Sequence, residues 1–174
     1  WAAQAGIGWV GKNGMVLRRD MGSWFFLGVV ITTLELSADA PMPDYCGDCR
    51  RCIEACPTGA IVDPKTVDAR RCIAYHTIEN RGKIPELVQE HQGTWVFGCD
   101  LCQEACPWNQ RFAKTTTEAD FLRREGVATP SIEELVDMDE GAFLNRFQGT
   151  PVMRATHAGL RRNARIAQKN TKHS

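Results

Sequence analysis

Cysteine is the residue type whose spacing in this chain most directly predicts chemistry. Four of the eight cysteines form the run C-x2-C-x2-C-x3-C-P, a later run reads C-x2-C-x3-C-P, and one cysteine lies between them. In chain order they are Cys46, Cys49, Cys52 and Cys56, then Cys72, then Cys99, Cys102 and Cys106. The first run has the spacing of bacterial two-cluster ferredoxins, whose thiolates hold 4Fe–4S clusters. The sequence therefore predicts an electron carrier or an enzyme that is fed by electrons.

Eight thiolates are the number that two 4Fe–4S clusters require. In the ferredoxin pattern, the cysteine that precedes the proline ligates the other cluster. Cys56 and Cys106 each precede a proline, so we expect both to cross over. The ligands expected for cluster one are Cys46, Cys49, Cys52 and Cys106. The ligands expected for cluster two are Cys56, Cys72, Cys99 and Cys102.

Two other roles for paired cysteines compete with this prediction. Disulfides dominate small secreted scaffolds, and this chain of 174 residues is neither short nor visibly secreted. Structural zinc sites usually place two C-x2-C pairs roughly 15–20 residues apart. The two runs here lie much further apart, and zinc does not require a proline after the fourth cysteine. The iron–sulfur interpretation is therefore favoured.

The cysteines need elements that position them. Residues 15–19 and 23–33 have the composition of strands, and Asp20–Gly22 between them favours a turn. The apolar run from Trp24 to Thr33 is too short to span a bilayer and predicts a buried strand. Helices are expected over 68–80, 85–91, 131–137, 139–147 and 155–169. Ser131 and Glu134 fit a capping box at the start of one of them.

A glycine-rich loop precedes these strands at residues 6–14. Its glycines permit a close approach of the backbone to a neighbouring group. The pattern is not a Walker P-loop, because Lys12 is followed by Asn13, and it does not follow a strand as a dinucleotide fingerprint must. A structural turn and a cofactor contact both stay open.

Composition limits the fold and the partners. With 174 residues, 43% of them hydrophobic, the chain can bury a core as one domain or two small ones. The 21 Lys and Arg balance 21 Asp and Glu, yet residues 151–174 hold six basic side chains and no acidic one. This uneven distribution predicts a local contact with a polyanion.

Several segments together resemble the epoxyqueuosine reductase family. They are AGIGWVGKNG at 5–14, SWFFLGVV at 23–30, YCGDCRRCIEACPTGAI at 45–61, RRCIAYHTIENRG at 70–82, FGCDLCQEACPWN at 97–109 and GLRRNARIAQKN at 159–170. The cysteine runs alone are shared with many ferredoxins, whereas the GWVGKN loop and the CIAYHTIE segment are far more specific. The resemblance covers essentially the whole chain.

The resemblance implies an α+β fold in three parts. Residues 1–44 would be the C-terminal part, a remnant, of an α/β cobalamin-binding reductase domain. Residues 45–109 would form a bacterial-ferredoxin-like domain with two 4Fe–4S clusters. Residues 110–174 would be a C-terminal helical segment that begins a HEAT-like tRNA-binding region.

The resemblance also implies chemistry. Members of this family reduce epoxyqueuosine to queuosine at the tRNA wobble position, using cobalamin fed by electrons from two 4Fe–4S clusters. Gly11, Lys12 and Asn13 match the family's loop beside the cobalamin, and Asp100 is a further candidate to face the corrin. The family's proton-donating aspartate lies before the AGIGW segment, so we expect it upstream of Trp1. We therefore expect this chain to be a fragment that is inactive without that region.

The basic C-terminal segment is the candidate RNA contact. Its relevant side chains share much of one helical surface: Arg161, Arg162, Arg165 and Lys169. Contacts from these residues to phosphates would give an affinity that falls steeply with salt. The alternative is an ordinary solvated helix face.

Two other functions remain as alternatives. Reductive dehalogenases share the cobalamin and two-cluster plan but would not need the basic segment. A non-catalytic ferredoxin-like carrier would need neither the glycine-rich loop nor the C-terminal helices. We further expect an external electron donor of flavodoxin or ferredoxin type, a cytoplasmic location, a monomer and no membrane attachment.

Overall fold

The structure, a computed structural model, describes residues 1–122, 127 and 130–172. It divides into two compact units, and each unit consists of two stretches of chain. Unit 1 is residues 1–67 and 101–115, and unit 2 is residues 68–100 and 116–174. The expected domain boundaries after residues 44 and 109 partition the chain differently and stay a prediction.

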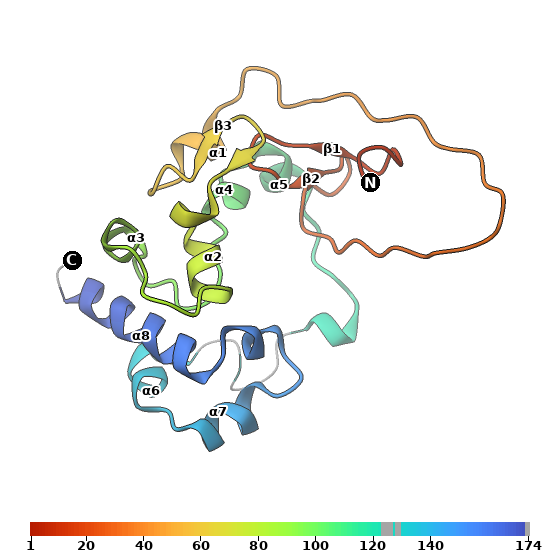
Figure 1. Cartoon of the computed structure of the whole chain (residues 1–174). Coiled ribbons are helices and arrows are strands. Elements are labelled where there is room, and N and C mark those ends of the chain that lie inside the picture. Colours follow the sequence, from red (N-terminus) through yellow and green to blue (C-terminus); the bar gives the residue numbers. More distant parts are fainter. Residues whose placement is uncertain (123–126, 128–129, 173–174) are drawn as a thin grey trace. The chain divides into compact units, whose positions relative to one another are not determined.

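Unit 1 begins with a short hairpin. Strand β1 (Trp9–Val10) pairs antiparallel with β2 (Val16–Leu17), with Trp9 opposite Leu17 (Figure 1). A Cβ atom at Gly8 would collide with the Leu17 carbonyl oxygen, and one at Gly11 would collide with the Leu17 side chain. The packing of the hairpin therefore accounts for these two glycines of the loop. The expected turn also follows β2, because Arg18 and Gly22 form an antiparallel bridge.

The strand expected over residues 23–33 is wrong. These residues carry no regular secondary structure, and Figure 1 shows them in a long loop that leaves the hairpin and returns at the first cysteine run. Phe26, Val30 and Ile31 are 83%, 87% and 96% exposed. Aromatic and β-branched residues favour strands only where a neighbouring strand and a packed face are present. No described strand pairs with this segment.

The two cysteine runs of unit 1 form matching one-turn helices. Helices α1 (Arg51–Glu54) and α4 (Leu101–Glu104) each read x-C-x-E, and each is followed by A-C-P. The chain then diverges: after α1 it forms the antiparallel pair β3 (Ile61–Asp63) and β4 (Thr66–Val67). After α4, Pro107 becomes the first residue of α5 (Pro107–Phe112). Proline suits this position because its missing N–H would be unpaired there in any residue.

Unit 2 is helical. Cys72 stands at the junction between a 3-10 turn (Ala69–Arg71) and α2 (Ile73–Ile78), and α3 (Glu86–His91) follows. The later helices are α6 (Ile132–Asp137), α7 (Glu140–Phe147) and α8 (His157–Thr171), as expected to within two residues at each end. The capping box of Ser131 and Glu134 is confirmed.

Two apolar clusters form the core of unit 2. One packs α8 against α6 and α7 through Leu135, Phe143, Phe147, Leu160 and Ala164. The other joins α2, α3 and α8 through Ile73, Ile84, Val88 and Ile166, with Cys99 against it. Helices and two small sheets confirm the α+β class. No helix in the described part of the chain is long and apolar enough to cross a membrane.

Candidate iron–sulfur and cofactor site

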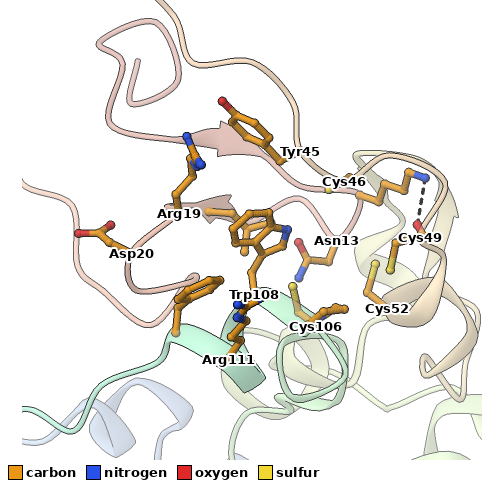
Figure 2. A pocket seen from close by; sticks show the side chains of 14 residues that line it. Asn13, Arg19, Asp20, Tyr45, Cys46, Cys49, Cys52, Cys106, Trp108 and Arg111 are labelled. Carbon is orange, nitrogen blue, oxygen red and sulfur yellow. Dashed lines mark hydrogen bonds between the residues drawn. The ribbon is translucent and has the colours of Figure 1, made fainter.

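Four thiols of unit 1 line a single cavity of about 800 Å³. They belong to the four residues expected to hold cluster one: Cys46, Cys49, Cys52 and Cys106. Three come from the loop and helix of the first run, and the fourth follows α4 from the second run (Figure 2). The fold therefore brings Cys106 to the first run, although more than forty residues separate them in sequence.

The thiols of this cavity influence one another. Burial raises the pKa of the Cys52 thiol, and the neighbouring Cys106, Cys46 and Cys49 raise it further. No group of three His, Cys, Asp or Glu side chains in the described part of the chain is arranged to bind a single metal ion. A 4Fe–4S cluster takes one thiolate on each of its separate irons, so its ligands surround a volume. A cavity bordered by four thiols suits that geometry.

The second expected set of cysteines is divided. Cys56 and Cys102 belong to unit 1, whereas Cys72 and Cys99 belong to unit 2. Burial acts to raise the pKa of the Cys56 thiol. Hydrogen bonds from the Thr58 hydroxyl and nearby backbone amides to the sulfur outweigh burial, so the pKa is lowered. The Ala60 amide donates to the sulfur at 3.2 Å. The complete set of four ligands stays a prediction.

Lys12 and Asn13, two of the expected cobalamin contacts, also line this cavity. Lys12 Nζ donates to the carbonyl oxygens of Gly47 at 2.6 Å and Cys49 at 2.9 Å. Asn13 is buried, and its Nδ2 donates to the Cys102 carbonyl oxygen at 3.4 Å. The loop therefore contacts both cysteine runs. Gly11 and Asp100 are not among the described residues that line the cavity.

Aromatic side chains form another wall of the cavity. Trp108 stacks on Phe112 with ring centroids 5.4 Å apart, and Tyr45 and Trp108 meet edge to face at 6.1 Å. The buried Trp9 lies behind them, with its centroid 5.2 Å from that of Tyr45 and 5.1 Å from that of Trp108. Two arginines add charge at the edge: Arg19 lies over Tyr45 and Arg111 over Phe112. Sequence reasoning missed these residues, although GWVGKN and CPWN were both singled out.

Asn109 is a further residue that sequence reasoning missed. It is 4% exposed and accepts a hydrogen bond from the Ser23 amide at 2.6 Å, while its Nδ2 donates to the Gln103 carbonyl oxygen at 2.8 Å. A Cβ atom on Gly22 would strike its side chain. Hydrogen bonds of Asn109 therefore hold the turn after β2 against the second cysteine run.

The four basic residues of α8 fall into two pairs. Arg161 Nε donates to the Val136 carbonyl oxygen at 3.0 Å. Arg162 donates to the carbonyl oxygens of His76 at 2.8 Å, Asn80 at 2.9 Å and Gly82 at 2.6 Å. Burial, together with the charge of Arg81, lowers the pKa of Arg162. These two arginines are half-buried and stabilise unit 2 itself.

Arg165 and Lys169 are the other pair. Both are exposed, and both lie on the expected helix. They are the members of the predicted RNA-contact set that present their charge to solvent.

Known proteins resemble this chain in sequence and fold. Residues 45–109 match the family model described as 4Fe-4S double cluster binding domain. This region of the chain is therefore a 4Fe–4S cluster-binding domain. Other segments of the chain define the family more narrowly.

The chain is 51% identical to an epoxyqueuosine reductase from Synechocystis over 94% of its own length and 57% of the relative's. It is 48% identical to one from Gloeobacter violaceus over 96% of its own length and 54% of the relative's. A solved epoxyqueuosine reductase from Bacillus subtilis matches with a TM-score of 0.92 and 31% identity, covering 99% of this chain and 46% of that one. Another, solved with an epoxyqueuosine-modified tRNA stem loop, matches with a TM-score of 0.92 and 32% identity, covering 98% of this chain and 45% of that one.

The chain belongs to the epoxyqueuosine reductase family. It spans about half the length of the curated relatives it matches.

Proposed function

We propose that this chain is the iron–sulfur part of an oxidoreductase that reduces epoxyqueuosine to queuosine at the wobble position of tRNA. The observation that carries the proposal is the cavity of unit 1, where four thiols from two separate runs meet the Lys12 loop. The similarity to epoxyqueuosine reductases over nearly the whole chain supports the same conclusion.

Two 4Fe–4S clusters would carry the electrons. Cluster one would take Cys46, Cys49, Cys52 and Cys106, and cluster two would take Cys56, Cys72, Cys99 and Cys102. The double-cluster family match and the shared cavity support the first set most directly. An external carrier of flavodoxin or ferredoxin type would supply one electron at a time.

Cobalamin would occupy the part of the cavity that the aromatic residues border. Binding sites for large organic cofactors are mostly apolar, with a few placed polar groups, and this cavity has that character. Tyr45, Trp108 and Phe112 would hold the cofactor by apolar contacts, while Asn13 and Arg111 would offer polar contacts. When bound, cobalamin supplies the two-electron chemistry that opens an epoxide, and the protein positions it. The aromatic wall would exclude water from that site, and Lys12 would hold the first cysteine loop in place.

The tRNA contact of this chain would come from α8. We assign it to Arg165 and Lys169, because Arg161 and Arg162 already donate to backbone carbonyl oxygens of unit 2. The solved relative with a modified tRNA stem loop supports an RNA partner for the family. In this proposal α6, α7 and α8 begin the HEAT-like region, and residues 1–44 belong to a cobalamin-binding domain.

The test uses the complete gene product, purified without oxygen. Iron and sulfide analysis should give two 4Fe–4S clusters, and cobalamin titration should give a saturable spectral change. Turnover is then measured with epoxyqueuosine-containing tRNA and, separately, with a halogenated arene. Reduction of the tRNA alone supports the proposal. Turnover of the arene alone would indicate a dehalogenase, and clusters without cobalamin binding would indicate an electron carrier.

A further inference from the structure

The ammonium group of Lys12 lies against the loop that joins the first two thiols of cluster one. Its Nζ donates to two carbonyl oxygens of that loop, Gly47 O at 2.6 Å and Cys49 O at 2.9 Å. No ion pair between Lys12 and a carboxylate is present among the described residues. Its positive charge is therefore directed at backbone oxygens beside cysteine sulfurs.

The backbone around Lys12 is fixed on both sides. The Lys12 carbonyl oxygen accepts from the Lys65 amide at 3.0 Å, and the Gly11 amide donates to Met15 O at 2.8 Å. Asn13, the next residue, is buried and bonded to the second cysteine run. A side chain on such a support is held near its working position before any cofactor binds.

A second donor reaches the same loop from β1. Trp9 is only 2% exposed, and its indole Nε1–H points at Cys46 Sγ, 3.4 Å away. Hydrogen bonds to ligand sulfurs are one of the factors that set the potential of an iron–sulfur cluster, and net charge is another. Unit 1 therefore places a hydrogen-bond donor, Trp9, and a positive charge, Lys12, at the Cys46–Cys49 loop.

We infer that Lys12 is a positioning residue that also raises the reduction potential of cluster one, with Trp9 acting in the same direction. This inference rests on the proposed function, because it requires that cluster one forms. A 4Fe–4S cluster with four thiolates is an anion, and one-electron reduction adds a further negative charge without making or breaking a bond. A nearby cation and an N–H donor stabilise the reduced form more than the oxidised form. The electron comes from the one-electron carrier that feeds the enzyme.

Lys12 then acts on the cluster and not on the corrin. With the Lys12 charge present, cluster one accepts an electron more readily than it would without that charge. Electron delivery to cluster one by a low-potential carrier then becomes more favourable.

The test is a redox titration followed by electron paramagnetic resonance on the complete, reconstituted protein. Lys12→Met removes the charge at similar length, Lys12→Arg keeps it, and Trp9→Phe removes the N–H but keeps an aromatic ring. We expect Lys12→Met to shift one of the two midpoint potentials to more negative values, with a several-fold lower reduced fraction at the wild-type midpoint. Lys12→Arg should shift it much less, and Trp9→Phe should shift the same cluster in the same direction.

Lys83→Met is the control, because the Lys83 side chain is exposed in unit 2 and its ammonium pairs with Glu86 at 4.0 Å. It should leave both potentials unchanged. Unchanged potentials in both Lys12→Met and Trp9→Phe would overturn the inference, as would equal shifts in Lys12→Met and Lys12→Arg. If Lys12→Met loses iron while Lys12→Arg retains it, the positioning role is supported and Trp9→Phe decides the effect on potential. A wild-type protein without two clusters would instead refute the proposed function.

Discussion

Lys12 in unit 1 and Arg162 in unit 2 use the same type of contact for different purposes. Each donates to backbone carbonyl oxygens: Lys12 to those of the Cys46–Cys49 loop, and Arg162 to those of α2 and the turn that follows it. The Arg162 guanidinium is half-buried and serves three carbonyl oxygens, two of them beyond the end of the helix. Arginine suits such a site because its donors are arranged in a rigid plane. The Lys12 charge lies instead on the wall of an open cavity.

The difference teaches that a basic residue in a ligand-binding motif need not contact the ligand. Sequence similarity suggested a corrin contact for Lys12 and an RNA contact for Arg162. In the structure, Lys12 donates to the Cys46–Cys49 loop, and Arg162 stabilises the fold of unit 2. Four predictions test this contrast.

The largest effect should come from Cys106→Ser. If the cavity holds cluster one, Cys106 is the fourth ligand beside Cys46, Cys49 and Cys52. The substitution then removes a ligand of cluster one, although the sequence neighbours Cys99 and Cys102 belong to cluster two. Iron content should fall by about four per chain, the content of one 4Fe–4S cluster. Mössbauer and electron paramagnetic resonance spectra should retain the signals of cluster two. Loss of the signals assigned to cluster two alone would contradict the cavity as the site of cluster one.

Arg162→Ala should produce the next largest effect, on stability. The substitution leaves three carbonyl oxygens without their charged donor, which costs about 3 kcal/mol. A loss of that size lowers the thermal midpoint by roughly 6–12 °C in a protein of this length. Calorimetry of wild type and variant measures it.

Arg165→Ala is the matched control on the same helix. Its side chain is exposed, so the change in stability should stay within about 0.5 kcal/mol. Equal losses in the two variants would show that helix propensity or charge, and not the carbonyl contacts, explains the effect of Arg162.

Substitution of the two exposed basic residues of α8 should change RNA binding and leave stability unchanged. The double substitution Arg165→Gln and Lys169→Gln should weaken binding of a tRNA anticodon stem loop without lowering the thermal midpoint. Each lost phosphate contact should reduce the slope of log affinity against log salt by about 0.7–0.9. Fluorescence anisotropy at several salt concentrations measures the slope. An unchanged slope would leave α8 with a purely structural role.

Local and long-range features of this chain differ in how well the sequence predicts them. The Ser131 capping box and the helix around Phe143 and Leu144 depend on residues a few positions apart, and both are present. The approach of Cys106 to the first run followed from a ferredoxin rule that already contains the long-range pairing. The apolar run at 24–33 gave no information about a pairing strand, so the expected strand was wrong. The contacts of Trp9 and Lys12 with the Cys46–Cys49 loop also required the fold, because more than thirty residues of sequence separate them from that loop.

The smallest effect should come from Ser131→Ala, which removes the cap of α6. The Ser131 hydroxyl accepts from the Glu134 amide at 3.1 Å, and α6 packs against α8 within unit 2. Loss of an N-cap costs about 1 kcal/mol, so the thermal midpoint should fall by roughly 2–4 °C. Ser131→Asp, another good N-cap residue, should retain most of the stability. Because neither substitution alters unit 1, the potential of cluster one should stay at its wild-type value in both. A shift of that potential in Ser131→Ala would show that general loss of stability, and not the local charge of Lys12, changes the cluster.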